Sequence, residues 1–329
     1  MSASLAFSPD VLRIDAASET ERIVAGTRNI VLRQLKRRGV VIGVSGGIDS
    51  AVVAFLCARA LGKERVFALF TPETESSPDS LRLGRVVADA LGVRSAVEDI
   101  TSTLKAAHCY ERRDAVVRRV FPDYGYGCRC RVVLPSAHDP QRCALFSVVL
   151  QAPDGQANWV RLSPEDYCDI VAATNFKQRV RKMMEYYYAD LLQYAVAGAP
   201  NRLEYDQGFF VKNGDGAADV KPIAHLYKSQ VYQLAAHLGV PEEIRRRPPA
   251  TDTYPLEQSQ EEFYFMLPLE KMDFCLYGKN NGIPAAGLAA AVGLDTDQVQ
   301  RVYDAIQAKR KAAQYLREAP VLVEEVAEV

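Results

Sequence analysis

The sequence predicts an α/β fold in which helices cover both faces of a doubly wound parallel sheet. Two apolar runs, Val40–Val44 and Val66–Phe70, have the length and composition of short buried strands, and Ser95–Ile100 is a candidate for a third strand. The spacing of apolar residues changes to a helical period between them, over Ala51–Leu61 and Ser80–Leu91. Such alternation of strand and helix is typical of parallel sheets, because each parallel connection needs a crossover.

Length, composition and charge limit the classes to which the chain can belong. Its 329 residues are 48% hydrophobic and 25% charged, which supplies enough apolar surface for a core. The net charge of -1 argues against a non-specific nucleic-acid binder, since such proteins carry a large basic excess. No apolar run approaches the roughly 18 residues of a membrane-spanning helix, so no membrane partner is expected. The N-terminus lacks the features of a signal peptide, and seven cysteines in a long chain do not suggest a disulfide scaffold. We therefore expect a cytoplasmic protein.

The remaining elements follow in chain order. A capping-box pattern, Ser18-x-x-Glu21, predicts the start of a first helix that stops at Gly39. Residues 112–163 are interpreted as a β-rich flap inserted into a single domain that spans residues 1–329. Two apolar runs in this insert, Ala144–Gln151 and Ala157–Leu162, flank a turn typical of a hairpin.

Helical periodicity returns after the insert. Six apolar residues are predicted to form one stripe of a helix: Phe176, Val180, Met183, Met184, Tyr187 and Leu191. Two more helices are predicted over Lys228–Leu238, which ends at Gly239, and over Asp297–Leu316.

The segment Ser45-Gly46-Gly47-Ile48-Asp49-Ser50, between the first strand and its helix, carries the strongest chemical signal. Two glycines let the backbone approach an anion closely, and the N–H groups and positive dipole at a helix start favour phosphate. Ser45 and Ser50 can add hydroxyl donors. Asp49 suits this place if it holds a divalent cation that bridges to phosphate. The spacing is not that of a Walker A loop, and a tight turn with serine caps remains the alternative.

This segment resembles the pyrophosphate loop of the N-type ATP-pyrophosphatase superfamily, whose members adenylate a substrate and release pyrophosphate. The superfamily includes GMP synthetase, asparagine synthetase, tRNA-thiolating enzymes and NAD synthetase, and the resemblance implies an adenine nucleotide alpha hydrolase-like fold. Further segments are similar to the NAD synthetase family in the order in which that family carries them. They are Asn175–Arg181, then Glu204 followed by Gly208–Asp219, and finally Pro222-Ile223 with Leu226-Tyr227-Lys228.

The resemblance implies a set of functional residues. Asp49, Glu204 and Lys228 would be catalytic, and Asp49 with Glu204 would bind magnesium. ATP would contact Gly43, Ser45, Gly46, Gly47, Asp49, Ser50, Arg179, Lys228 and Thr251. The deamido-NAD substrate would contact Asn175, Lys212, Asp215 and Asp219. A homodimer is also implied. Without the resemblance, the alternative is that these charged residues belong to a solvated glycine loop and to solvent-exposed faces of helices.

The implied reaction is ammonia-dependent NAD synthesis. ATP adenylates the nicotinate carboxylate of deamido-NAD, and ammonia then displaces AMP to give NAD, AMP and pyrophosphate. Because the recognisable motifs start by Val40, we expect no glutaminase domain, so that free ammonia or a separate protein supplies the nitrogen.

Several features leave alternatives open. The segment Pro248–Pro255 departs from the family pattern, which places the ATP contact at Thr251 (or Thr253) in doubt and allows a shifted substrate. A tRNA-thiolating enzyme and a non-catalytic nucleotide-binding protein are the rival functions. The cluster Arg245–Arg247 is interpreted as a solvated face. A zinc site is a further alternative, with these candidate ligands in or near the insert: His108, Cys109, Cys128, Cys130, His138 and Cys143.

Overall fold

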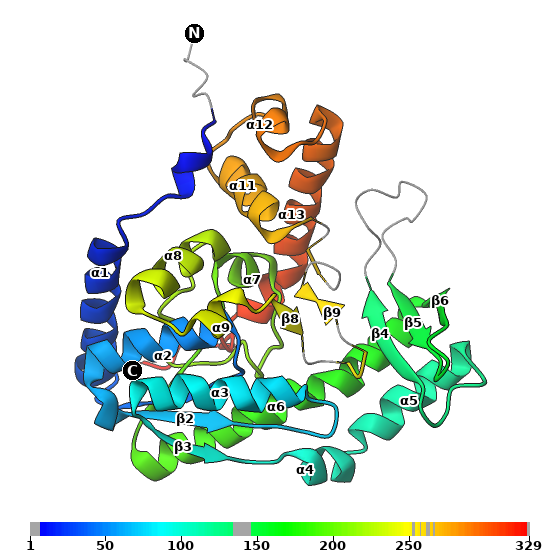
Figure 1. The fold of residues 1–329 in the computed structure, drawn as a ribbon, viewed down its shortest axis with the longest axis horizontal. Helices are drawn as coiled ribbons and strands as arrows, with labels where there is room; N and C mark the ends of the chain where they lie inside the picture. The colour runs from blue at the N-terminus through cyan, green and yellow to red at the C-terminus, as the bar shows by residue number, and fades with distance from the viewer. Residues whose placement is uncertain are drawn as a thin grey trace.

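A computed structural model describes residues 7–133, 146–251, 254–256, 258–260, 264–265 and 267–327 (Figure 1). Its central sheet has four parallel strands in the order β3-β2-β1-β7, which confirms the predicted parallel sheet. The strands are β1 (Val40–Gly43), β2 (Val66–Phe70), β3 (Arg94–Val97) and β7 (Ala195–Ala197). The predicted second strand has the observed bounds, whereas the third ends three residues before the predicted Ile100.

Helices cover both faces of this sheet, as predicted. Val40 and Ile42 of β1 belong to the larger core, which is closed by helices on one face. These helices are α1 (Ala16–Asn29), α2 (Ile48–Leu61), α3 (Pro78–Leu91) and α8 (Lys228–Leu238). Val41 points to the opposite face, where it packs with Phe67 and Leu69 against α6 (Pro164–Leu192). Alternation along the strand therefore sends neighbouring residues to two different cores.

The first helix begins earlier than predicted. It starts at Ala16, and the side chain of Asp15 accepts hydrogen bonds from the N–H groups of Ala17 and Ser18. The predicted start at Ser18 is therefore wrong, because an aspartate three residues earlier already caps the helix. The helix then continues through a π-helical turn, Ile30–Gln34.

The insert forms its own antiparallel sheet of β4 (Arg129–Val133), β5 (Ser147–Gln151) and β6 (Ala157–Arg161), which lies beyond one end of the central sheet (Figure 1). The predicted hairpin between the last two strands is confirmed. Residues 112–120, however, are helical, since they belong to α5 (Cys109–Val120). They were expected to be part of a β-rich flap, but Val116 and Val117 are buried on the inner face of this helix, so the β-rich expectation is wrong there.

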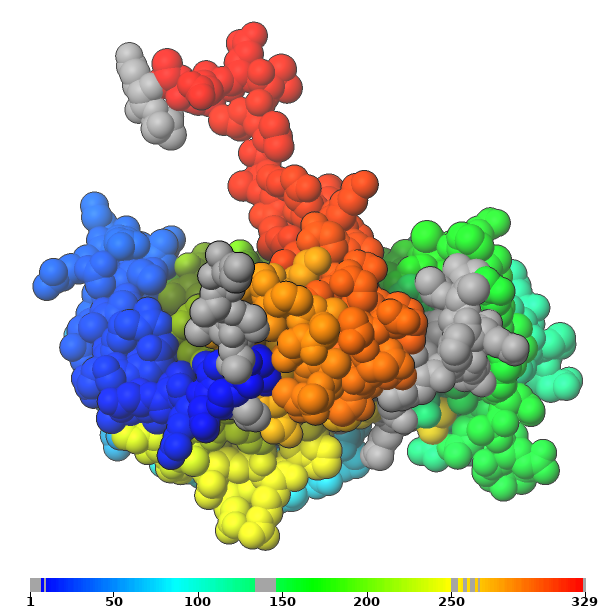
Figure 2. Space-filling view, turned by 90° about the horizontal axis from the view of Figure 1, so that it is seen from above, coloured from blue at the N-terminus to red at the C-terminus, as the bar shows by residue number. Residues whose placement is uncertain are grey.

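The C-terminal third is helical and forms a second core around Leu276, Leu288 and Ile306. Its helices are α11 (Leu269–Asn280), α12 (Ala285–Val292) and α13 (Thr296–Arg317), the last of which matches the prediction to within one residue at each end. Shorter elements are α4 (Thr101–Ala106), α7 (Arg202–Gln207), α9 (Glu242–Arg246), β8 (Ala250–Thr251), β9 (Gln258–Ser259), and the 3-10 turns Pro9–Leu12 and Lys63–Arg65. After α13 the chain projects clear of the body (Figure 2). Among the described residues, no helix is both long and apolar enough to cross a membrane.

The predicted apolar stripe of α6 divides into two faces, so the expectation of a single stripe is wrong. Val180 is buried, and Phe176 and Met184 pack beside it against the core of α4 and α5. Met183, Tyr187 and Leu191 are instead 51%, 58% and 63% exposed. These three residues follow one another at intervals of four and so lie on one side of the helix. We call them the α6 apolar row.

Candidate active site

The predicted phosphate loop lies where β1 ends and α2 begins. Gly46 has a φ of +73°, and a Cβ atom there would stand 2.7 Å from Cβ of Leu83 and 2.8 Å from the carbonyl oxygen of Ser80. Only glycine fits this position without strain. Within the loop, Oγ of Ser50 donates to the carbonyl of Gly47 at 3.0 Å and accepts from the N–H of Ser45 at 3.3 Å. The turn is thus pre-formed against the N-terminus of α2, as anion binding requires.

The loop opens into a cavity of about 690 Å³. Most of the residues predicted to bind ATP, deamido-NAD or metal line it: Gly43, Ser45, Gly47, Asp49, Ser50, Asn175, Arg179, Glu204, Lys212, Asp215 and Lys228. Gly46 completes the loop behind this lining, and Thr251 lies in β8. Asp219 is an exposed residue beside β7. It is not among the lining residues, and its carboxylate accepts from the N–H of Val196 at 2.7 Å and from the hydroxyl of Tyr186 at 3.3 Å.

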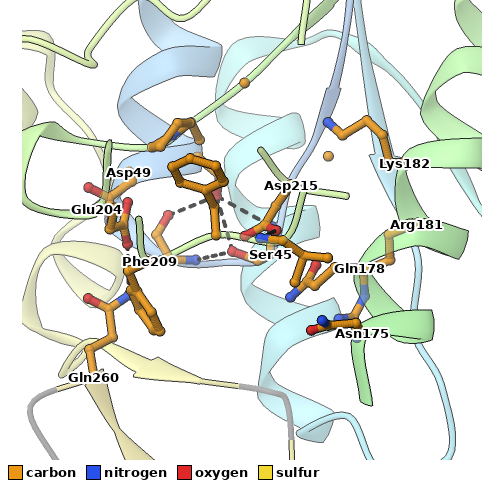
Figure 3. A pocket seen from close by; sticks show the side chains of 18 of the residues that line it. Ser45, Asp49, Asn175, Gln178, Arg181, Lys182, Glu204, Phe209, Asp215 and Gln260 are labelled. Atoms are coloured by element: carbon orange, nitrogen blue, oxygen red, sulfur yellow. Dashed lines mark hydrogen bonds between the residues drawn. The ribbon is translucent and has the colours of Figure 1, made fainter. Parts of the chain in front are cut away.

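The three predicted catalytic residues come together at one end of the cavity. Nζ of Lys228 donates to Oδ2 of Asp49, and the side-chain amide of Asn201 donates to Oδ1 of Asp49 at 3.1 Å. The backbone N–H of Asn201 donates to Oε2 of Glu204 at 3.0 Å. Asn201 therefore ties the two carboxylates together, and Figure 3 shows Asp49 and Glu204 side by side. Sequence reasoning missed Asn201, although its spacing to Glu204 is that of a capping box.

The electrostatics of this cluster favour a cation. Burial, reinforced by the negative charge of Asp49, raises the pKa of Glu204 to about 8. Burial alone would lower the pKa of Lys228, but the carboxylates of Asp49 and Glu204 more than offset this effect and raise it. Lys228 is the first residue of α8, whose N-terminal N–H groups are held by the carboxylate of Asp273 from α11. The lysine is thus fixed in place and charged.

Helix α6 and the segment after α7 form the facing walls of the cavity. Asn175, Gln178 and Arg181 project from α6 opposite the Asp49 cluster (Figure 3). Asp215 lies between these α6 residues and Asp49 (Figure 3). Its Oδ1 accepts a hydrogen bond from the N–H of Val211 at 2.8 Å, and burial raises its pKa. Lys212 also lines the cavity, and its Nζ donates to the backbone carbonyl of Tyr315 in α13 at 2.8 Å.

Two further groups of the cavity were not predicted. Arg247 lines the cavity and donates to the carbonyl of Ser45 at 3.4 Å and to Oγ of Ser80 at 3.1 Å, so the expectation of a solvated face is wrong for this residue. Lys182 and Glu185 form a buried ion pair at 2.6 Å. A Cβ atom at Gly43 would lie 2.7 Å from Oε1 of Glu185, which explains the glycine at the end of β1.

Two features were left open by the sequence, the candidate zinc site and the alternative hydroxyl of Thr253. No group of three or more potential metal ligands occurs within the part of the chain that the structure describes, and His138 and Cys143 lie outside that part. Cys109 and Cys130 are buried thiols, and burial raises the pKa of each to about 11. Thr253, the alternative hydroxyl to Thr251, also lies outside the described residues.

The family model and the similar sequences agree on one family. The family model described as NAD synthase matches residues 19–134 and 156–320. The chain is 58% identical to the NH(3)-dependent NAD(+) synthetase of Rhizobium meliloti over 99% of this chain and 97% of that protein. Among solved structures, the NMN synthetase of Francisella tularensis has a TM-score of 0.62 at 20% identity, covering 94% of this chain and 98% of that one. The NH3-dependent NAD synthetase of Campylobacter jejuni has a TM-score of 0.61 at 22% identity, covering 94% and 100%; at this identity, both structures support the fold alone.

Proposed function

The chain belongs to the NAD synthase family, and from this premise we propose that it is an ammonia-dependent NAD synthetase, a ligase that forms a C–N bond. The observation that carries the proposal is that the phosphate loop opens into the same cavity as Asp49, Glu204 and Lys228. A nucleotide triphosphate and a second large anionic ligand can meet there.

The chemistry proceeds in two steps. A carboxylate resists attack by ammonia because it is anionic and has no good leaving group. A carboxylate oxygen of the nicotinate therefore first attacks the α-phosphorus of ATP, the bond from that phosphorus to pyrophosphate breaks, and an acyl adenylate forms. The nitrogen of ammonia then attacks the acyl carbon, AMP leaves with the C–O bond electrons, and one proton passes to solvent.

This chain's residues would act by positioning and by stabilising charge. The N–H groups of the phosphate loop, with Lys228 and Arg247, offer donors to the phosphates of ATP. Asn175, Lys212 and Asp215 would hold the deamido dinucleotide, and Arg179 would contact ATP. No side-chain nucleophile is needed, since much of the catalysis would come from bringing two anionic ligands together in a fixed geometry.

The donor set near the loop fits magnesium. Magnesium is bound in nucleotide sites by one or two carboxylates together with substrate phosphates, and Asp49 and Glu204 provide two carboxylates. Burial and the negative charge of Asp49 disfavour the charged form of Glu204 and raise its pKa, and a divalent ion bound there would oppose this effect. When bound, the ion would neutralise charge on the departing pyrophosphate. Asn201 would keep both carboxylates oriented, because it is bonded to each of them.

We also propose that the protein forms a homodimer whose interface buries the α6 apolar row. An exposed row of methionine, tyrosine and leucine on a long helix is unfavourable in water, and a second copy of the chain can cover it with the same surface. This row lies on the helix that supplies Asn175 and Arg179 to the cavity, so dimer formation would stiffen that wall.

A single assay tests the activity against its two rivals. The purified protein is mixed with ATP, magnesium, deamido-NAD and ammonium, and AMP and NAD are measured with time. The proposal expects NAD and AMP to form in equal amounts. When deamido-NAD is withheld, neither product should form. Tight ATP binding without AMP formation would indicate a non-catalytic nucleotide-binding protein. AMP formation that depends on tRNA and a sulfur donor would indicate a thiolating enzyme.

A further inference from the structure

Among the charged residues of its predicted motif, Lys177, Arg179 and Arg181, helix α6 directs only Lys177 away from the cavity. Only 1% of the side chain is exposed, although Asn175 and Gln178 beside it line the cavity. Its Nζ donates to Oε1 of Glu73 at 2.9 Å and to Oε2 of Glu75 at 2.7 Å. Both glutamates belong to the segment that follows β2. Burying such charges is costly unless they are paired, so this lysine has a defined partner set rather than a solvated role.

A second cation reaches the same carboxylates from α5. Arg113, whose side chain is 3% exposed, forms an ion pair with Glu75. The hydroxyl of Tyr110 donates to Oε2 of Glu73 at 2.7 Å, and both cations lie within 6 Å of the centre of its ring. Burial would raise the pKa of Glu75, but the hydrogen bond from Arg113 and the charge of Lys177 more than offset this and lower it. We call these five residues the buried ion cluster: Glu73, Glu75, Tyr110, Arg113 and Lys177.

The segment that the cluster holds is also a wall of the cavity. Thr71, Pro72 and Ser76 line the cavity on either side of the two glutamates. Arg181, one turn after Lys177 on α6, reaches the carbonyl of Thr71 and Oγ of Ser76, each at 3.5 Å. Helix α6 therefore contacts residues 71–76 in two places. Lys177 forms ion pairs on the buried side, and Arg181 forms long hydrogen bonds on the cavity side.

Sheet order places this segment on the ATP side of the site. β2 is the neighbour of β1, so residues 71–76 emerge beside the phosphate loop. The N–H of Val44 bonds to the carbonyl of Leu69 at 2.9 Å, which fixes the two strand ends together. Lys212 and Asp215 follow β7, on the other side of β1. A shift of residues 71–76 would therefore disturb the ATP half of the cavity before the dinucleotide half.

We infer that Lys177 is a positioning residue for ATP: through Glu73 and Glu75 it holds the segment 71–76 against α6 and thereby sets both the cavity wall and the place of Arg181. This inference rests on the proposed function and adds a residue that touches neither substrate. The lysine belongs to the predicted motif because of the neighbours that it holds, whereas Asn175 and Arg179 belong to it because of the cavity.

The test compares Lys177→Met with the double variant Lys177→Met/Glu73→Gln. In the single variant the KM for ATP should rise about tenfold or more, while the KM for deamido-NAD changes by less than about threefold. The double variant should recover part of the loss, because Glu73→Gln removes the buried negative charge that Lys177 had paired. A general loss of stability would not produce this split between substrates or this rescue. Melting temperatures are measured for every variant.

A matched control and a milder variant complete the design. Arg119→Gln removes another contact between α5 and α6, the ion pairs of Arg119 with Asp166 and Asp169. The Arg119 side chain is 48% exposed, so this variant should leave both KM values unchanged. Tyr110→Phe deletes only the hydroxyl that bonds to Glu73 and should raise the KM for ATP by a few-fold. If Lys177→Met does not fold, the double variant and Tyr110→Phe decide the matter. An unchanged KM for ATP in the variants that fold, or equal rises for both substrates, overturns the inference.

Direct binding separates this inference from the proposed activity. Calorimetry with magnesium and a non-hydrolysable ATP analogue should show the same loss of affinity in Lys177→Met relative to the wild-type protein. This measurement does not depend on turnover. A wild-type protein that binds the analogue but forms no NAD would therefore contradict the activity alone, whereas equal affinities in the two proteins would contradict the role of Lys177 alone.

Discussion

The ammonium group of Lys228 is bonded to the carboxylate of Asp49, although the two residues stand 179 positions apart in the chain. The first helix after β1 supplies the carboxylate, and the first residue of α8 supplies the ammonium group. Asp49 belongs to the phosphate loop itself, so the bond places a positive and a negative charge where the proposed function puts the triphosphate. In that proposal, a bound phosphate would give Lys228, and a magnesium ion would give Asp49, another partner of opposite charge.

Replacing Asp49 by asparagine should therefore abolish most of the activity. The amide keeps the size of the side chain but cannot bind a cation strongly, and we expect kcat to fall by about 100-fold or more. NAD formation is measured at saturating substrates. Asp79→Asn is the matched control, since that aspartate forms an exposed ion pair on α3 and should have no effect. Wild-type turnover by Asp49→Asn would remove this residue from the mechanism.

The raised pKa of Glu204 predicts a pH dependence of stability in the metal-free protein. Its pKa of about 8 exceeds the ordinary value of 4.5, so the folded protein binds more protons than the unfolded chain between these values. The stability that this group contributes is present below about pH 4.5 and is lost as pH rises through about 8. Glu204→Gln should thus lose less stability than the wild-type protein between pH 6 and pH 9, values that bracket about 8.

Urea denaturation in the presence of EDTA measures this difference, with the wild-type protein and Glu204→Gln compared at each pH. Because every other titrating group is shared, the difference between the two unfolding free energies isolates Glu204. Parallel curves for the two proteins across this range would show that the carboxylate titrates normally.

Substitutions at two glycines can distinguish the effect of backbone strain on stability from the loss of phosphate binding. Gly46 and Gly62 both have positive φ, at +73° and +88°, but a Cβ atom at Gly46 would strike Leu83 and Ser80, whereas one at Gly62 would meet nothing within 4 Å. Gly62→Ala should lose about 1–3 kcal/mol of stability, because its backbone conformation suits only glycine, and should keep its affinity for ATP. Gly46→Ala should lose more stability and also lose ATP affinity, measured by calorimetry. Similar ATP affinities in the two variants would argue against a phosphate-binding role of the loop.

The α6 apolar row makes a prediction about assembly. Tyr187→Asp places a charge in the centre of the row, and an interface that must desolvate this charge should dissociate. Light scattering after gel filtration should then show a dimer for the wild-type protein and a monomer for the variant. Trp159→Asp, at an aromatic residue of β6 that is 55% exposed, should leave the mass unchanged. A monomeric wild-type protein would rule out the proposed dimer.

Much of the fold could be predicted because its signals are local. Val66–Phe70 reads as a buried strand from five consecutive apolar residues, and Lys228–Leu238 is bounded by its own stop signal at Gly239. The first helix start was missed because Asp15 and Ser18 are both acceptable caps, and only the observed hydrogen bonds choose between them. The insert was harder, since α5 has many charged residues and its buried face depends on contacts with the later strands.

The residues of the candidate site also fall into those with a local sequence signal and those whose role depends on distant partners. The phosphate loop could be found from its own residues, because glycine and serine at these positions have a direct physical meaning. Asn201 and Arg247 could not be found so directly, since their importance comes from distant partners, Asp49 in the first case and Ser45 in the second. Lys177 could be placed in a motif, but nothing in the sequence shows that it points away from its neighbours toward Glu73.

Helix α6 is shared by two parts of the molecule, and this has a mechanical consequence. Ile170, near its start, is buried in the core of the insert, and Ala189, near its end, is buried beneath the central sheet. At about 1.5 Å per residue, its 29 residues form a rod of about 43 Å without a joint. The insert and the cavity wall therefore share one continuous helix. A tilt of the insert that carries α6 with it would also move Asn175 and Arg179, which line the cavity.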